Sequence, residues 1–166
     1  GGIYMPTVQT MFYPTFVAVI AILILLVIPR SDLRRLIPRA TVLGGVGDIV
    51  TVFIYQDLLG VIWFKNHGIW ECANQHFFSP VGWTLVMVLY FYFYPDSPRI
   101  LRYLYTGAWA ALAVGYGLLV RNVELYDFKP WFFPIPMYLV FLGWFAFAIW
   151  AYHALSNEDS PELADS

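Results

Sequence analysis

Long apolar stretches alternate with short polar ones along this chain. Each long stretch approaches or exceeds the ~20 residues that a helix needs to cross the ~30 Å hydrocarbon core of a bilayer. A spanning segment must satisfy its own backbone hydrogen bonds, and the sequence lacks the alternating pattern of barrel strands. The pattern therefore predicts an all-α membrane bundle of five transmembrane helices, at residues 11–28, 40–64, 77–94, 100–120 and 131–154.

The composition favours the same class of protein. The chain of 166 residues is 60% hydrophobic and 20% aromatic, and only 12% of its residues are charged. An average soluble domain has roughly 25% charged residues, so too few polar residues remain here to cover a water-facing surface. The formal net charge of -2 indicates no basic face, and we expect no nucleic-acid partner. A single cysteine, Cys72, excludes an internal disulfide framework.

The basic residues predict an orientation in the plasma membrane. Six arginines lie on one side of the predicted bundle, and three basic residues lie on the other. The positive-inside rule then places the N-terminus outside and the C-terminus in the cytoplasm. The arginines expected in the cytoplasm are Arg30, Arg34, Arg35, Arg39, Arg99 and Arg102.

Two terminal segments are expected outside the bundle. Residues 1–10 would form an outer N-terminal segment, in which residues 1–4 precede Met5 and are either native or an artificial addition. Residues 155–166 are acidic and polar, and we expect them to be a disordered cytoplasmic tail.

A weak internal repeat relates two predicted helical hairpins. The motif "LRRL" at 33–36 aligns with "LRYL" at 101–104, and the same offset aligns Gly47 with Gly115 and Asp48 with Tyr116. Each copy would contain a basic start, a Gly/Ala-rich helix, an aromatic outer loop and an aromatic returning helix. The bundle would then be one lead helix plus two related, parallel hairpins. Chance similarity between such helices is the alternative.

Several motifs resemble an uncharacterised family of small, roughly five-helix integral membrane proteins found mostly in spore-forming Firmicutes. The resemblance covers residues 10–155 and rests on "IPRSDLRRLIP", Asp48, "LLGVIWFKNHGIWE", "FFSPVGW" and "WAYHAL". It implies the five-helix topology and a Gram-positive plasma membrane. The activity of the family is not established, so it implies no catalytic residue. The stretch "SPVGWTLVMVLY" is more distantly similar to the third helix of the tryptophan-rich sensory and translocator proteins.

Small and polar residues follow one face of the second predicted helix. Their three- and four-residue spacing aligns them, and small residues in lipid let helix backbones approach. We therefore expect this face to pack against other helices, and the face with Leu43, Ile49, Val50 and Phe53 to point away from them. The small and polar residues are Thr41, Gly44, Gly45, Asp48, Thr51, Val52 and Tyr55.

Asp48 is the most informative residue of that face. It follows Ala40 by about 12 Å at 1.5 Å per residue, a depth at which a charge costs on the order of 3 kcal/mol. The repeat predicts that the Tyr116 hydroxyl bonds to Asp48 directly or through water, with Tyr55 as the alternative donor. Two interpretations stay open: an interhelical polar clamp, or the centre of a ligand, proton or ion site.

The predicted outer side holds further polar side chains. Asp57 points about 180° away from Asp48, and we interpret it as an interfacial carboxylate, with pairing to Arg121 as the alternative. Residues 65–76 contain metal-binding residue types whose spacing matches no established zinc pattern. We expect no metal there, and the candidate ligands would be His67, Glu71, Cys72 and His76. The two outer loops could instead cover an outward-facing cavity lined by Glu71, Glu124 and Asp127.

Three function classes follow from these observations. The leading one is a non-enzymatic membrane protein that binds or passes a small ligand or ion through a polar pocket, which requires a cavity at Asp48. The second is a structural or partner-binding subunit in a homo- or hetero-oligomer, which should be packed solid there. The third is an intramembrane enzyme with acid and base carboxylates, although the sequence contains no P-loop, HExxH motif or dinucleotide fingerprint and implies no cofactor. The predicted ligand-binding residues are Asp48, Tyr55, Tyr116, Thr51, Thr41, Glu71 and Glu124.

Overall fold

A computed structural model describes residues 6–64, 71–72, 75–76, 78–122 and 126–158. These residues form an all-helical bundle with two short pairs of strands at one end. The helical elements are α1 (Pro6–Val27), α2 (Arg30–Ala40), η1 (Thr41–Val46), α3 (Gly47–Val52), η2 (Phe53–Leu58), α4 (Phe78–Phe93), α5 (Arg99–Asn122), η4 (Pro130–Phe132) and α6 (Ile135–Glu158). The strands are β1 (Ile62–Phe64), β2 (Glu71–Cys72), β3 (Gln75–His76) and β4 (Tyr126–Phe128).

Elements α2, η1, α3 and η2 follow one another without a break, and we call them helix 30–58. This helix begins ten residues before the predicted start because its first turns are amphipathic: Leu33 and Leu36 are buried, whereas Arg34 and Arg35 are exposed. Pro38, which precedes the predicted helix at 40–64, lies inside α2. The π-helical segment η1 begins three residues later, where the missing proline N–H already disturbs the regular ladder.

Helix 30–58 ends in a glycine turn, six residues before the predicted end. Gly60 has a φ of 64°, which glycine adopts without steric cost. The N–H of Val61 donates a 2.8 Å hydrogen bond to the carbonyl of Tyr55, six residues earlier, and so satisfies a carbonyl of the last π-helical segment, η2. The chain then turns into strand β1 at Ile62, so the expectation of helix up to residue 64 is wrong.

The two antiparallel strand pairs were not expected from the sequence. Ile62 of β1 pairs with Phe128 of β4, and the N–H of Lys129 donates a 2.8 Å bond to the carbonyl of Val61. Strand β2 pairs with β3 in the same way. Because β1 follows helix 30–58 and β4 follows α5, the first pair joins the connections of both predicted hairpins.

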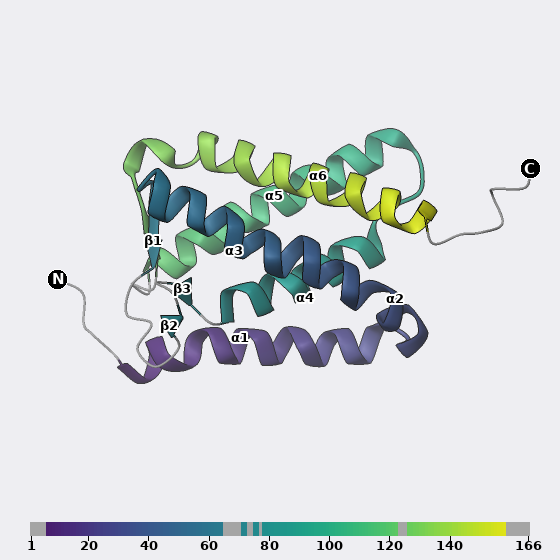
Figure 1. Ribbon diagram of the computed structural model, residues 1–166, viewed down its shortest axis with the longest axis horizontal. Coiled ribbons are helices and arrows are strands. Elements are labelled where there is room, and N and C mark those ends of the chain that lie inside the picture. Colours follow the sequence, from purple (N-terminus) through teal and green to yellow (C-terminus); the bar gives the residue numbers. More distant parts are fainter. Residues whose placement is uncertain (1–5, 65–70, 73–74, 77, 123–125, 159–166) are drawn as a thin grey trace, which may run out of the picture.

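The helices lie lengthwise beside one another, and the chain reverses direction between them (Figure 1). We call the end with the strands the strand end. The opposite end, where α2 begins and α4 connects to α5, is the arginine end, since the chain carries six arginines in or beside these turns. Helix α4 packs against α1, α2 and η1, whereas α5 packs mainly on α6. The expected tail begins later than predicted, because α6 continues to Glu158.

A buried tyrosine joins three helices near the arginine end. The hydroxyl of Tyr90 in α4 lies 2.9 Å from the hydroxyl of Thr106 in α5 and donates to the carbonyl of Phe145 in α6 over 3.3 Å. The hydroxyl of Tyr105 donates to the Tyr90 carbonyl over 2.8 Å. These bonds hold α4, α5 and α6 together at this level of the bundle.

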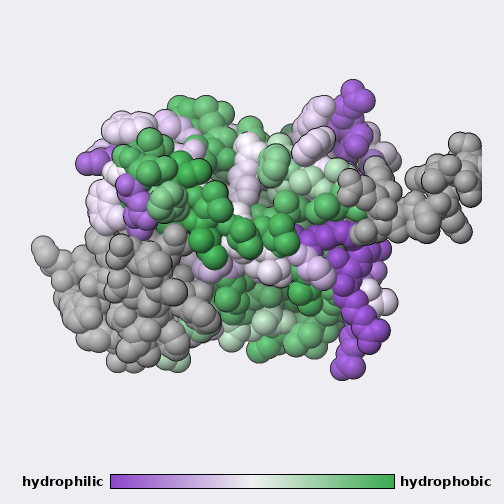
Figure 2. All heavy atoms as spheres, viewed as in Figure 1, coloured by the Kyte–Doolittle hydropathy of each residue, from purple (hydrophilic) through white to green (hydrophobic). Residues whose placement is uncertain are grey.

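The surface between the two ends is largely apolar. Three helices are long and apolar enough to cross a membrane, namely Arg30–Leu58, Arg99–Asn122 and Ile135–Leu155, and Met11–Val27 and Phe78–Phe93 are shorter apolar helices. Figure 2 shows hydrophobic residues over the middle of the visible face and a hydrophilic band at the arginine end. Exposed apolar side chains such as Leu26 and Leu25, which are 78% and 68% exposed, belong to this surface.

Candidate functional site

Asp48 occupies the middle of helix 30–58. It lies in the short α-helical segment α3, between the π-helical segments η1 and η2. At 1.5 Å per residue, Asp48 lies about 27 Å from Arg30 and about 15 Å from Leu58. Short π-helical turns inside α-helices occur frequently at functional sites, and the Asp48 side chain between them is only 3% exposed. The helix therefore presents this carboxyl group deep inside the bundle.

Two glycines hold helix 30–58 close to α4. A Cβ atom on Gly44 would lie 2.6 Å from the carbonyl oxygen of Trp83, and one on Gly45 would lie 2.7 Å from the hydroxyl of Thr84. At Gly44 the neighbour is backbone, so any larger residue would require movement of the helices, whereas at Gly45 the Thr84 side chain would have to move. The close approach confirms the prediction that the small residues of this face pack against another helix. We call this contact the glycine seam.

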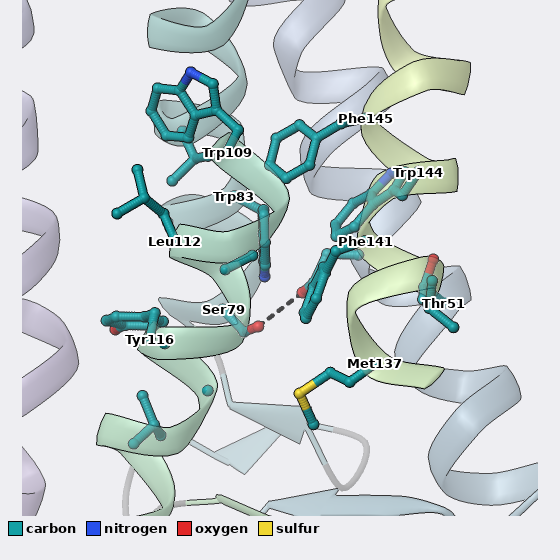
Figure 3. Close-up of a pocket in the computed structure, with 18 of the residues that line it drawn as sticks. Thr51, Ser79, Trp83, Trp109, Leu112, Tyr116, Met137, Phe141, Trp144 and Phe145 are labelled. Carbon is teal, nitrogen blue, oxygen red and sulfur yellow. Dashed lines mark hydrogen bonds between the residues drawn. The ribbon is translucent and has the colours of Figure 1, made fainter. Parts of the chain in front are cut away.

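The glycine seam brings Asp48 beside the first turn of α4. The hydroxyl of Ser79 donates a 2.8 Å hydrogen bond to Oδ2 of Asp48, and the two side chains are 8% and 3% exposed. This bond is the dashed line in Figure 3. The Asp48 carboxyl group has no basic partner within the part of the chain that the structure describes. The observed hydrogen-bond partner of the Asp48 carboxyl group is thus the neutral hydroxyl of Ser79.

Asp48 and Ser79 form one corner of a cavity of about 880 Å³ in the centre of the bundle. All five long helices contribute to its walls, and β1 and η4 contribute to it at the strand end. No lysine, arginine or histidine lines it within the described residues. The lining residues drawn and labelled in Figure 3 are Thr51, Ser79, Trp83, Trp109, Leu112, Tyr116, Met137, Phe141, Trp144 and Phe145.

The cavity brings together three of the other residues predicted to bind a ligand. Thr51, Tyr55 and Tyr116 all line it, and the ring of Tyr55 lies 5.9 Å from the ring of Phe132. Thr41 lies elsewhere: it is exposed, and its hydroxyl donates to the carbonyl of Ile37 in its own helix over 2.8 Å. The expectation that Thr41 shares the pocket is therefore wrong, because Thr41 lies on the exposed side of helix 30–58, whereas its neighbour Ala40 is buried.

The predicted hydrogen bond between Tyr116 and Asp48 is not formed. Ser79 takes that position on Asp48, and the Tyr116 hydroxyl is buried without a hydrogen-bond partner among the described residues. The ring of Tyr116 stacks instead on Phe16 of α1, with 4.6 Å between centroids. Tyr116 and Asp48 thus belong to one cavity but to different walls of it.

Arg121 pairs with a different acid from the one considered in the sequence. Its Nε lies 3.0 Å from Oδ1 of Asp127, and its guanidinium carbon lies 4.9 Å from the centre of the Phe128 ring. Asp57 is exposed and accepts a hydrogen bond of 3.4 Å from the side chain of Gln56. The alternative of an Asp57–Arg121 pair is therefore wrong, whereas the interpretation of Asp57 as a surface carboxylate agrees with its exposure.

The remaining candidates lie outside the residues whose side chains are described. His67 and Glu124 fall outside the described residues, and Glu71, Cys72 and His76 are described only as backbone in β2 and β3. Within the described ranges, no group of three His, Cys, Asp or Glu side chains could hold a metal ion. The expectation of no metal at these residues and the lining roles of Glu71 and Glu124 therefore stay predictions. Asp127, the third acid predicted to line the cavity, is described: it pairs with Arg121 and does not line the central cavity.

Sequence reasoning missed the residues of α4 and α6 that complete the site. Ser79 was not among the predicted binding residues, although a hydroxyl at the start of an otherwise apolar helix is a usable signal. Trp83 and Trp144, whose ring centroids lie 4.5 Å apart, were read only as part of apolar segments. A Cβ on Gly47 would lie 3.3 Å from Nε1 of Trp144. The Trp144 ring therefore packs against the residue that precedes Asp48 in the sequence.

The arrangement suits an apolar molecule with a polar end. The volume of the cavity lies within the range of roughly 300–1,000 Å³ that is usual for small-molecule sites, and such sites are mostly apolar with a few polar groups. The comparisons with known proteins give no match: no family model, no curated protein and no solved structure is similar to this chain. The geometry of the cavity is consequently the basis for a functional assignment.

Proposed function

We propose that this protein is a small integral membrane protein that binds a small, largely apolar ligand in the central cavity. The observation that carries this proposal is a cavity of about 880 Å³ beside a buried carboxyl group with no basic partner among the described residues. A scaffold would be packed solid at this point. An ion path would need a continuous polar lining, whereas most lining residues here are aliphatic or aromatic.

The exposed surface supports a membrane location. Large apolar side chains cover the outside of α1, helix 30–58, α5 and α6 between the two ends of the bundle. Water would make such a surface costly, and lipid would not. We propose that all five helices are embedded, with the arginine end in the cytoplasm of a plasma membrane, the N-terminus outside and the C-terminus inside. The bilayer is then the first partner of the protein.

Filling the cavity tests the proposal directly. Gly82 is buried and lines the cavity, and a Cβ there would meet only Val17, at 3.9 Å. Gly82→Leu should therefore occupy cavity volume with little steric conflict. Gly143 on α6 does not line the cavity and has nothing within 4 Å of its Cβ position, so Gly143→Leu is the matched control.

Native mass spectrometry of the protein purified from its membrane, followed by organic extraction, is the measurement. We expect a non-covalent small molecule on the wild type and on Gly143→Leu, and its loss from Gly82→Leu. Equal retention of every bound molecule by folded Gly82→Leu would contradict the proposal.

The role of Asp48 is tested separately. Asp48→Asn keeps the shape of the side chain and removes its charge, and Asp57→Asn is the control because Asp57 is exposed. We expect Asp48→Asn to retain less of the bound molecule than Asp57→Asn does. A polar clamp without a ligand role would instead change the free energy of unfolding and leave retention as in the wild type.

A further inference from the structure

The polar groups of the cavity are few and unevenly placed. Asp48 and Ser79 form one corner, and the Tyr116 hydroxyl lies on another wall with no hydrogen-bond partner among the described residues. Ionisable residues inside a membrane protein usually pair with an opposite charge or a hydrogen-bond network. Among the described residues, Asp48 accepts one hydrogen bond, from the neutral hydroxyl of Ser79, so a bound molecule would be the source of a compensating positive charge at this corner.

Aromatic rings surround this corner from two helices. Trp83 follows Ser79 by one helical turn in α4, and Trp144 of α6 packs against Gly47, the residue before Asp48. The rings of Trp83 and Phe141 stack with centroids 5.6 Å apart, and Figure 3 shows these rings with Trp144 in the same part of the cavity. Faces of tryptophan and phenylalanine rings attract cations, more strongly where water is excluded.

The cavity also reaches the apolar surface of the bundle on one side. Leu112 and Leu119 of α5 line it and are nevertheless 63% and 48% exposed. Leu112 and Tyr116 point away from α6 (Figure 3), and Tyr116 contacts α1 through Phe16. The opening therefore lies between α1 and α5, and we call it the lateral opening.

Helix α5 lines the cavity over the middle of its length. The lining residues of this helix extend from Ala108 to Val120, over which α5 rises about 18 Å. The arginines of α5, Arg102 and Arg121, lie outside this stretch. This stretch of α5 lies in the apolar part of the surface, between the two polar ends of the bundle. The opening therefore faces the region that lipid chains would occupy.

We propose that the ligand is a lipophilic amine, with an apolar body in the cavity and a cationic amino group at Asp48, and that it enters from the bilayer through the lateral opening. This inference rests on the proposed function and narrows it to one class of ligand. An ammonium group brings up to three donors to the carboxylate. A carboxylate ligand would meet a like charge, and an alcohol would bring one neutral donor.

Three probes with the same chain test the head group: decylamine, decanol and decanoate, each carrying a terminal bromine. Bromine quenches tryptophan fluorescence at short range, and Trp83, Trp109 and Trp144 line the cavity. The full chain is placed in nanodiscs of zwitterionic phosphatidylcholine, and quenching is titrated for the wild type and for Gly82→Leu. The difference between these two proteins removes quenching by probe that is merely dissolved in the bilayer.

We expect the amine to bind the wild type on the order of tenfold more tightly than the alcohol, because charge-assisted hydrogen bonds are roughly twice as strong as neutral ones. Decanoate should bind most weakly. Asp48→Asn should bring the amine to the level of the alcohol, whereas Asp57→Asn should not. The order of the three affinities on the wild type shows whether the cavity prefers an amine, even where Asp48→Asn fails to fold.

The outcomes separate this inference from the proposed function. If all three probes bind the wild type equally, and more tightly than they bind Gly82→Leu, the cavity binds apolar ligands and the assignment to amines is wrong. Preferential binding of decanoate overturns it as well. If no probe distinguishes the wild type from Gly82→Leu, the site does not bind these apolar chains, which contradicts both the inference and the proposed function.

Discussion

Two contacts between helices in this bundle have opposite character. At the glycine seam, Gly44 and Gly45 bring helix 30–58 so close to α4 that a Cβ atom would lie within 2.7 Å of its neighbours. At the lateral opening, α1 and α5 meet through the stacked rings of Phe16 and Tyr116, and exposed leucines line the space beside them. The seam fixes the position of Asp48, and the opening leaves volume in front of it.

The difference shows that side-chain size determines which helices of an apolar bundle can pack closely. Lipid supplies no hydrophobic force between helices, so close packing depends on small residues and on hydrogen bonds across the contact. The seam has both, since the Ser79–Asp48 bond lies next to the glycines. The lateral opening has large side chains, and its buried Tyr116 hydroxyl is without a hydrogen-bond partner among the described residues.

Breaking the glycine seam should have the largest effect on stability. In Gly44→Ala, the new methyl group would meet the carbonyl oxygen of Trp83 at 2.6 Å, and overpacking of this kind costs about 1–3 kcal/mol. Gly115→Ala in α5 is the control, because nothing lies within 4 Å of that Cβ position, and it should gain up to ~1 kcal/mol from helix propensity. Unfolding in mixed micelles, followed by circular dichroism, measures both free energies, and equal values would contradict the comparison.

Removing the hydroxyl of Tyr90 should lower the free energy of unfolding, whereas removing the hydroxyl of Tyr116 at the lateral opening should not. Tyr90→Phe loses the bonds to Thr106 and Phe145, and at roughly 0.6 kcal/mol per interhelical bond in membranes the loss is about 1 kcal/mol. Tyr116→Phe loses no hydrogen bond to a described residue and should leave the free energy of unfolding unchanged. The same unfolding titration compares them, and a larger loss for Tyr116→Phe would show that its hydroxyl has a structural partner.

Removing the Ser79 hydroxyl should have a smaller effect on stability. Ser79→Ala deletes one bond to Asp48, so we expect a loss of roughly 0.6 kcal/mol. Thr15→Ala removes a hydroxyl from the exposed side of α1 and serves as the control. A double-mutant cycle with Asp48→Asn measures the coupling between Ser79 and Asp48, and a coupling of zero would mean that the bond does not contribute to folding.

Narrowing the lateral opening should leave stability almost unchanged and slow the access of ligand. Leu112→Trp places a larger ring at a residue that is 63% exposed, and such surface substitutions change stability by no more than about 0.5 kcal/mol. Leu139→Trp is the control, since Leu139 is 58% exposed on α6 and does not line the cavity. Stopped-flow quenching by bromodecylamine should show slower association for Leu112→Trp alone, and equal rates would place the access route elsewhere.

Much of the fold follows from the sequence because long apolar runs determine where helices form. The small face of helix 30–58 could be predicted as well, since the four-residue spacing of Gly44, Asp48 and Val52 aligns them, and Asp48 and Val52 are indeed buried. The strand pair of β1 and β4 could not, because its partners are distant in the chain and each strand has only three residues.

The partner of Asp48 could not be predicted, because it depends on the relative position of two helices. An internal repeat aligned Asp48 with Tyr116, but the two copies pack differently: a Cβ on Gly47 would touch Trp144, whereas nothing lies near the corresponding position on Gly115. The closeness of the glycine seam selects Ser79 instead. Sequence spacing identified the face of the helix, and packing between helices determined which residue meets it.

A crystal structure of the full chain, grown in a lipid mesophase with decylamine, tests the central claim most directly. We expect continuous density for the alkyl chain in the central cavity, with the amine nitrogen about 3 Å from a carboxyl oxygen of Asp48. A cavity closed by movement of α1 onto α5, with Asp48 bonded to protein groups alone and decylamine absent from the interior, would contradict the account.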